Sequence, residues 1–98
     1  MTDPHTIARS LSPAQRAILK TGTSEAESDY PYRSNRLIGL DCGLDVPDVR
    51  AAVQVLRGVL LLKFERGLVD EDGRFFGSGH CLTPLGQSVR AIIEEEGI

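Results

Sequence analysis

The segment Phe64-Glu65-Arg66-Gly67-Leu68-Val69 and the later segment Leu82-Thr83-Pro84-Leu85-Gly86 carry most of the fold information in this chain. A charged segment that ends at Gly67 is typical of a helix C-terminus, because glycine adopts the left-handed conformation there at little steric cost. Asp72-Gly73 then lies between apolar residues, which indicates a hairpin. Thr83 is a favoured N-cap residue, and the proline after it suits the first position of a helix. The sequence therefore predicts a helix, a hairpin over residues 67–82, and a further helix.

A long helix is expected before this hairpin. Asp45 can cap it, Pro47 is tolerated in the first turn, and Asp48 adds a negative charge near the positive end of the helix. Apolar residues then recur every three or four positions, at Val46, Val49, Val53, Leu56, Leu60 and Phe64. This spacing predicts one helix over residues 46–66.

Weaker signals define the other elements. Ser12 with Pro13 predicts a helix over residues 12–21, which ends before Gly22. Residues 35–41 form either a short helix capped by Asn35 or a short strand. Residues 1–10 are expected to be a flexible N-terminal arm, and residues 22–34 a loop. In the last helix, an apolar face is formed by Leu85, Val89, Ile92 and Ile93.

This order of elements resembles a winged helix-turn-helix domain of the MarR-like or PadR-like kind. The resemblance covers residues 11–93 and rests on three segments: Leu11-Ser12-Pro13 with the helix after it, Glu65 to Val69, and Leu82 to Gly86. It implies a mainly α fold with a small β-hairpin (α+β), in which "ERGLV" closes the recognition helix and the hairpin is the wing. Residues 11–98 are then a single domain.

The middle of the chain departs from the family pattern. Such regulators usually have a recognition helix of about fifteen residues, whereas the segment from Pro47 to Arg66 is longer and contains the apolar run Arg57 to Leu62. Either the helix is longer here and its extra turns are covered, or Gly58 breaks it in two.

Composition and charge narrow the function classes. The chain has 98 residues, 11 Lys and Arg against 14 Asp and Glu, and a net charge of −3. This balance does not favour nucleic-acid binding, which depends on Lys and Arg, but a local basic face is compatible with it. Cys42 and Cys81 are the only cysteines, and no export signal or apolar membrane segment is apparent. We therefore expect a cytoplasmic protein with reduced thiols and no membrane partner.

The resemblance implies a DNA-binding surface, with double-stranded DNA as the partner. Arg50, Gln54 and Arg57 are spaced by four and three residues and therefore share one helix face. Arg and Gln side chains can read guanine and adenine through paired hydrogen bonds. Arg74 at the wing tip and Arg36, or Arg33, are candidates for backbone contacts. The alternative is that this face is only the solvated side of an amphipathic helix.

No catalytic, metal or cofactor site is expected. His5, Cys42, His80 and Cys81 lack the close pairs of typical zinc sites, and no nucleophile or carboxylate has a correctly spaced companion. The glycines at 77 and 79 do not precede a helix as a phosphate loop requires. The protein is therefore interpreted as a non-enzyme without a cofactor.

The apolar run Val59 to Leu62 indicates an interface, because four consecutive apolar residues point all around a helix. Leu60, Leu61 and Leu62 are the candidate interface residues, with Leu61 on the side of Arg50, and a homodimer is expected. Alternatively, the loop over residues 22–34 covers this run. The tyrosines of that loop either pack over the core edge or form an arm that reaches a partner.

Two functions remain open from the sequence. The first is a winged-helix DNA-binding protein of bacterial or phage origin that regulates transcription as a dimer. The second keeps the fold without DNA, as a protein-interaction module of the kind used by small accessory proteins and inhibitors.

Overall fold

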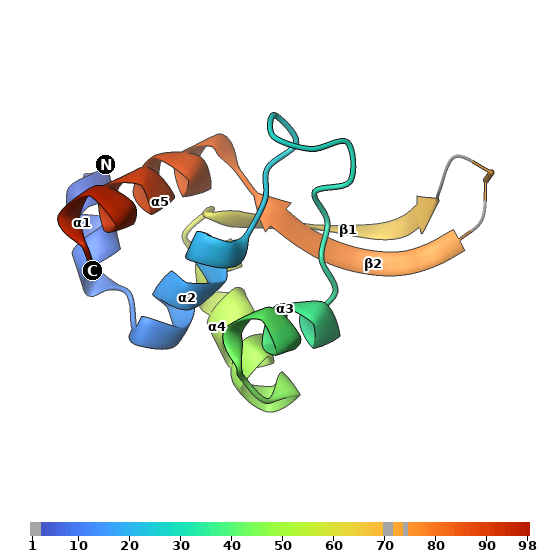
Figure 1. The fold of residues 1–98 in the computed structure, drawn as a ribbon, viewed down its shortest axis with the longest axis horizontal. Coiled ribbons are helices and arrows are strands. Elements are labelled where there is room, and N and C mark those ends of the chain that lie inside the picture. Colours follow the sequence, from blue (N-terminus) through green and yellow to red (C-terminus); the bar gives the residue numbers. More distant parts are fainter. Residues whose placement is uncertain (1–2, 70–71, 74) are drawn as a thin grey trace.

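The computed structural model describes residues 3–69, 72–73 and 75–98. Within these ranges, helices α1 and α2 are followed by α3 and α4, then by an antiparallel hairpin and helix α5 (Figure 1). Their bounds are α1 Pro4–Ser10, α2 Pro13–Thr21, α3 Asn35–Cys42, α4 Val46–Gly58, β1 Leu62–Val69, β2 Phe75–Leu82 and α5 Pro84–Glu96. The hairpin projects away from the group of helices (Figure 1). The predicted mainly α fold with a winged helix-turn-helix arrangement is confirmed.

Polar caps begin the helices where the sequence predicted them. The Ser12 hydroxyl accepts a hydrogen bond from the Gln15 amide, and the Gln15 side chain accepts one from the Ser12 amide, which makes a reciprocal capping box at α2. The Thr83 hydroxyl likewise accepts from the Gly86 amide at α5. The segment after the loop is a helix rather than a strand, but its cap is Ser34, one residue before the predicted Asn35.

The prediction of a flexible arm over residues 1–10 is wrong for residues 4–10, which form α1. This helix packs beside α5, so the two ends of the chain lie close together (Figure 1). Ile7 and Ala8 are buried, and the Arg9 guanidinium bonds the Glu96 carboxylate at 2.8 Å. A helix of seven residues is too short to show a clear apolar period, which is why its sequence gave no signal.

The predicted helix over residues 46–66 is correct only as far as Gly58. The chain then turns in the left-handed conformation at Leu60, whose φ is 65°. The Leu61 amide bonds the Leu56 carbonyl at 2.8 Å, and the Leu60 amide bonds the Arg57 carbonyl at 3.0 Å. This pair of bonds is the Schellman helix stop, which normally has glycine at the left-handed position. Leucine there carries a steric cost of about 1–2 kcal/mol.

The helix stop is fastened to the start of α5. The Thr83 hydroxyl donates to the Leu60 carbonyl at 2.5 Å, and the Thr83 amide donates to the Leu61 carbonyl at 3.1 Å. Leu61 is completely buried, as is Leu56. The chain therefore leaves the core at Leu62 as an extended strand.

The wing consequently spans residues 62–82 rather than 67–82. Leu62 pairs with Leu82 and Phe64 with His80 in the hairpin register. The "ERGLV" segment, predicted to close the recognition helix, lies in β1 instead. The register is irregular between Glu65 and Leu68, where Gly67 has a φ of 68°. The positive φ of this glycine therefore belongs to an irregularity of the strand and not to a helix C-terminus. The predicted Asp-Gly turn lies partly outside the described residues.

The loop over residues 22–34 is tied to β2 and α5. Arg33 and His80 exchange two backbone hydrogen bonds of 2.9 Å, and the Leu82 amide donates to the Thr23 carbonyl at 2.9 Å. Arg90 of α5 donates to the Gly22 carbonyl at 2.8 Å and to Glu27 at 2.6 Å. These contacts support the interpretation of a tethered loop over that of a free arm.

One core joins the helices to the base of the wing. Its most deeply buried side chains are Leu19, Val49, Leu56, Leu61, Cys81, Leu82, Val89 and Ile93. No helix in the described part of the chain is both long and apolar enough to cross a membrane.

We expect Gly86→Ala to destabilise the protein strongly. A Cβ at Gly86 would overlap the Leu61 carbonyl oxygen, a backbone atom that the Thr83 amide holds in place. Overpacking of this kind costs about 1–3 kcal/mol of unfolding free energy, to be measured by urea denaturation. Gly58→Ala is the matched control, because a Cβ at Gly58 meets no atom within 4 Å. Equal stability of the two variants would contradict the close approach of α5 to Leu61.

Candidate nucleic-acid interface

A shallow hollow lies between α4 and the base of the wing. Its volume is about 300 Å³, and we call it the arginine hollow; its lining residues are Asn35, Arg50, Val53, Gln54, Arg57, Phe64, Arg66 and His80. Three secondary-structure elements and the first residue of α3 thus contribute side chains to one surface feature. The hollow is the point where the helical part of the fold meets the hairpin.

The predicted residues Arg50, Gln54 and Arg57 lie together on the exposed face of α4. The opposite face of the helix carries Val49 and Leu56, which are completely buried. The helix is amphipathic because the apolar period fixes which side enters the core, and this leaves the two arginines and the glutamine directed outward. Sequence reasoning therefore grouped these three residues correctly.

The arginines of the hollow have no carboxylate partner among the described residues, unlike several other cations of the chain. Lys63 pairs with Glu25, and Arg90 pairs with Glu27 at 2.6 Å. Arg9 and Arg33 are also in ion pairs. Four cations among the described residues are thus paired with carboxylates, and of those without such a partner, Arg50, Arg57 and Arg66 lie together in one hollow.

Phe64 holds two of these arginines near each other. The Arg57 and Arg66 guanidinium carbons lie 5.5 and 5.7 Å from the centre of its ring. Both distances are within the range of cation–π attraction. The two positive charges therefore gather over one aromatic ring, although they repel each other.

His80 forms part of the buried floor of the hollow. Only 5% of the residue is exposed, its ring centre is 4.9 Å from that of Phe64, and neither ring nitrogen has a hydrogen-bond partner in the described structure. Burial, together with the positive charge of Arg57, lowers the pKa of His80 to about 4. The imidazole is therefore neutral at physiological pH. The Asn35 side-chain oxygen is a second buried polar atom without a partner.

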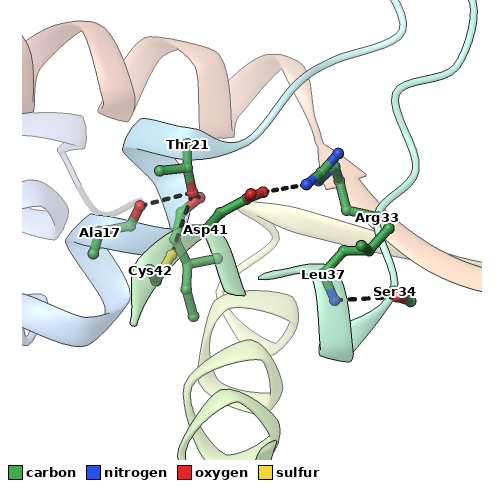
Figure 2. Close-up of polar contacts among 8 residues, drawn as sticks. Ala17, Thr21, Arg33, Ser34, Leu37, Asp41 and Cys42 are labelled. Atoms are coloured by element: carbon green, nitrogen blue, oxygen red, sulfur yellow. Dashed lines mark hydrogen bonds and ion pairs between the residues drawn. The ribbon is translucent and has the colours of Figure 1, made fainter. Parts of the chain in front are cut away.

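Contacts at both ends of α3, the helix that begins with Asn35, hold it in place (Figure 2). The Arg33 guanidinium pairs with the Asp41 carboxylate, and the Ser34 hydroxyl accepts from the Leu37 amide at 3.3 Å. At the other end of α3, the Cys42 sulfur lies 3.3 Å from the Thr21 hydroxyl of α2. Arg33, a candidate for a DNA-backbone contact, is thus in an ion pair with Asp41.

The other predicted DNA-binding residues lie apart from the hollow or outside the described structure. Arg36 is exposed on α3 and lines a separate depression with Leu40 and Leu44. Arg74 lies outside the described residues. Sequence reasoning missed Arg66 and Phe64, because it placed the "ERGLV" segment in a helix. The available signal was the alternation of Leu62 and Phe64 with Lys63 and Glu65, which is typical of a strand.

The predicted interface is wrong for two of its three residues. Leu61 is fully buried and Leu62 is 5% exposed, because the helix stop directs both into the core. Leu60 remains 68% exposed, next to the partly exposed Val55 and Val59. These three residues, with Leu11 and Leu85, line an apolar depression of about 390 Å³.

The described residues contain no group of three His, Cys, Asp or Glu side chains that could hold a metal ion. Cys42 and Cys81 are both free thiols.

No protein-family model matches the chain, and no curated protein sequence is similar to it. Several solved structures share its fold. One is a MarR-family transcription regulator, with a TM-score of 0.68 and 18% identity over 95% of this chain and 56% of that chain. A MarR-family regulator from Silicibacter pomeroyi gives a TM-score of 0.66 and 21% identity over 92% of this chain and 53% of its own.

MarR from Staphylococcus aureus, solved with salicylate and kanamycin, gives a TM-score of 0.63 and 19% identity over 96% of this chain and 57% of its own. The chain thus spans little more than half the length of these structures. At such low identity, the similarity establishes the fold that they share with this chain, the winged helix seen in MarR-family regulators.

The buried His80 predicts that acid destabilises the fold. The pKa of His80 is lowered from 6.5 to about 4, so the unfolded chain binds a proton more readily between these values. The contribution of His80 is complete above pH 6.5 and is lost as the pH falls toward about 4, by on the order of 3 kcal/mol in total. Denaturant unfolding across this pH range, with His80→Phe as the non-titrating comparison, measures the effect. An identical pH dependence for both proteins would contradict it.

Proposed function

We propose that this chain is a winged-helix DNA-binding protein that regulates transcription, and that the arginine hollow and the exposed face of α4 contact double-stranded DNA. The observation that carries this proposal is the convergence of Arg50, Arg57 and Arg66, which lack carboxylate partners among the described residues. Uncompensated arginines on one surface are the electrostatic basis of phosphate binding. The net charge of −3 does not oppose this, because the charge is distributed unevenly.

We assign each residue of the site a separate task in this proposal. Arg50 and Gln54 lie along α4, where their side chains can form paired hydrogen bonds with guanine and adenine edges in the major groove. Arg57 near the end of α4 and Arg66 on β1 flank the same aromatic ring, which suits contact with the phosphate backbone. Arg36 on α3 and the sequence-predicted Arg74 are proposed as further backbone contacts.

The fold similarity supports the same class of function. The MarR-family structures that resemble this chain are transcription regulators, and by analogy we propose a regulator without enzymatic activity or cofactor, located in the cytoplasm. Fold analogy alone does not define a function. The function must therefore be tested by substituting the residues of the site.

Arg50→Ala combined with Arg57→Ala is expected to lower the affinity for mixed-sequence duplex DNA. A base contact is worth about 1–3 kcal/mol, so the affinity should fall at least about tenfold. Each lost phosphate contact should also reduce the slope of the salt dependence by about one. Fluorescence anisotropy at two salt concentrations measures both quantities.

Lys20→Ala is the matched control, because Lys20 is exposed on α2 and is not among the residues that line the hollow. It removes one positive charge elsewhere and should change the affinity little. Binding that is equally weakened by Lys20→Ala would indicate a general charge effect. Absence of duplex binding by the unmodified protein at low salt would defeat the proposal.

A specific observation favours the alternative, a protein-interaction module without DNA. The N-terminus of α4, which usually enters the major groove first, carries the exposed acids Asp45 and Asp48. Leu40 on the neighbouring helix α3 is 68% exposed. Negative charge and exposed apolar surface at this end suit a protein partner better than DNA. Absence of duplex binding would favour this protein-interaction function over DNA binding.

We further propose that the protein acts as a homodimer through the apolar surface around Leu60. A leucine in the left-handed conformation is strained, yet its side chain remains 68% exposed beside Val55 and Val59. Leu60→Gly would relieve the backbone and remove the side chain, so it should weaken the dimer and raise the stability of the monomer by about 1 kcal/mol.

Sedimentation equilibrium measures the association, and thermal unfolding at low concentration measures the monomer. Leu40→Gly is the control for apolar exposure, since Leu40 is also 68% exposed but lies on α3. A dimer weakened by Leu40→Gly and unaffected by Leu60→Gly would place the interface elsewhere.

A further inference from the structure

We infer that the arginine hollow is a seat for a single phosphate group, bound at its rim by Arg57 and Arg66 and at its floor by the Asn35 amide and the His80 imidazole. The inference deepens the proposed function and rests on it for the source of the phosphate, which is the DNA backbone. A solvated basic face would attract phosphates without fixing one of them. A seat fixes one phosphate relative to both α4 and the wing.

Two different elements each supply one guanidinium to the rim of the hollow. Arg57 extends from α4 and Arg66 from β1, and both guanidiniums lie within 6 Å of the Phe64 ring centre, at 5.5 and 5.7 Å. Two guanidiniums gathered in this way repel each other when the hollow is empty of anions. A phosphate between them replaces that repulsion with charge-assisted hydrogen bonds, which are the strongest class of protein hydrogen bond.

The floor supplies an observation independent of the arginines. His80 is 95% buried by residue area, since 5% is exposed, and it lines the hollow with both ring nitrogens unpartnered in the described structure. The Asn35 side-chain oxygen is buried and also lacks a partner. Unpartnered buried polar groups are costly and require an explanation. Two of them beneath uncompensated arginines point to a polar ligand.

Both floor groups can donate to an oxyanion. A neutral imidazole has one N–H donor. A flip of the Asn35 side-chain amide, which exchanges its oxygen and nitrogen, directs its NH₂ group to the hollow. A phosphate has acceptor oxygens enough for the rim and the floor together. The hollow, with a volume of about 300 Å³, has room for a phosphate group.

The charges around His80 agree with an anion site. Arg57 faces it from α4, Arg66 lies across Phe64 on β1, and Arg33 and Asp41 share a small cavity with it. Among the described residues, Asp41 is the only carboxylate that lines either of the two hollows beside His80, and it is already paired with Arg33. The surroundings are thus net positive, and a bound anion would raise the pKa of His80 from its value of about 4.

The test is a titration of the isotope-labelled protein with inorganic phosphate at constant ionic strength, with chloride as the compensating ion. Nuclear magnetic resonance follows the ring nitrogens of His80 and the side-chain amide of Asn35. We expect saturable shifts of both signals and a rise in the pKa of His80, while the signals of His5, on α1, stay in place. Shifts that are linear in concentration, or equal for His5, would overturn the inference.

Asn35→Asp is the sharpest variant. It changes one atom of the side chain and places negative charge on the floor, yet an acid at the first position of α3 suits the positive end of that helix, so the fold should persist. Phosphate affinity should fall at least about tenfold, as it should for Arg57→Gln, because each loses a charge-assisted interaction. Lys20→Gln removes a distant charge and should leave phosphate binding unchanged. Equal losses in all three variants would overturn the seat.

Competition with a duplex separates this inference from the proposed function. Phosphate that displaces the duplex more strongly than chloride supports a seat for a backbone phosphate. Saturable phosphate binding without any duplex binding supports the seat, identifies a small phosphorylated ligand as its occupant, and defeats the DNA function. Duplex binding that depends on Arg50 and is unaffected by Asn35→Asp leaves the DNA function standing and overturns the seat.

Discussion

The left-handed turn at Leu60 is the constraint on which the rest of this structure depends. It ends α4 at Gly58 and sends Leu61 into the core, where the Leu61 and Leu60 carbonyls accept hydrogen bonds from Thr83. The end of one helix and the start of another are thereby joined at a single point. If α4 continued instead, residues 62–66 would be helical, β2 would lose its partner, and no wing base would form. The turn at one leucine, which forms despite its local steric cost, thus determines the topology.

The site is a consequence of that turn. Because residues 62–69 are a strand, Phe64 lies opposite His80 in the hairpin, and its ring also meets the guanidinium of Arg57. Arg66, two residues further along β1, reaches the same ring. In a continuous helix these groups would spread over several turns. The turn therefore converts a sequence of separate arginines into one cluster with a buried polar floor.

The sequence predicted the elements whose signals are local. Ser12 and Thr83 form side-chain caps at the positions where their chemistry favours them, and the three-four spacing up to Leu56 defines the buried face of α4. The grouping of Arg50, Gln54 and Arg57 followed from that spacing alone.

The failures have one physical origin, tertiary contacts that override local preference. Glycine is the usual mark of a helix stop, but here a leucine takes the left-handed position and Thr83, distant in sequence, supports it. The apolar period continues by chance through Leu60 to Phe64. Gly67 therefore resembles the end of a helix in the sequence, although it lies in β1. Likewise, α1 is stable because it packs on α5. Such tertiary packing leaves no signal in the local sequence of a short helix. His80 and Asn35 belong to the site because of tertiary structure. The hairpin register places His80 beside Phe64, and the start of α3 places Asn35 at the hollow.

The tethered loop has a consequence for how the wing meets other molecules. An exposed strand edge presents unpaired backbone groups that can recruit a strand from another chain and lead to aggregation. At the base of β2 that edge is occupied, because the backbone of Arg33 takes both hydrogen bonds of His80 and Thr23 accepts from Leu82. Gly79 permits this approach, since a Cβ there would lie 2.9 Å from the Arg33 nitrogen. Edge-to-edge joining of two wings through the base of β2 is thus blocked, so copies that meet at this edge must recognise each other through side chains.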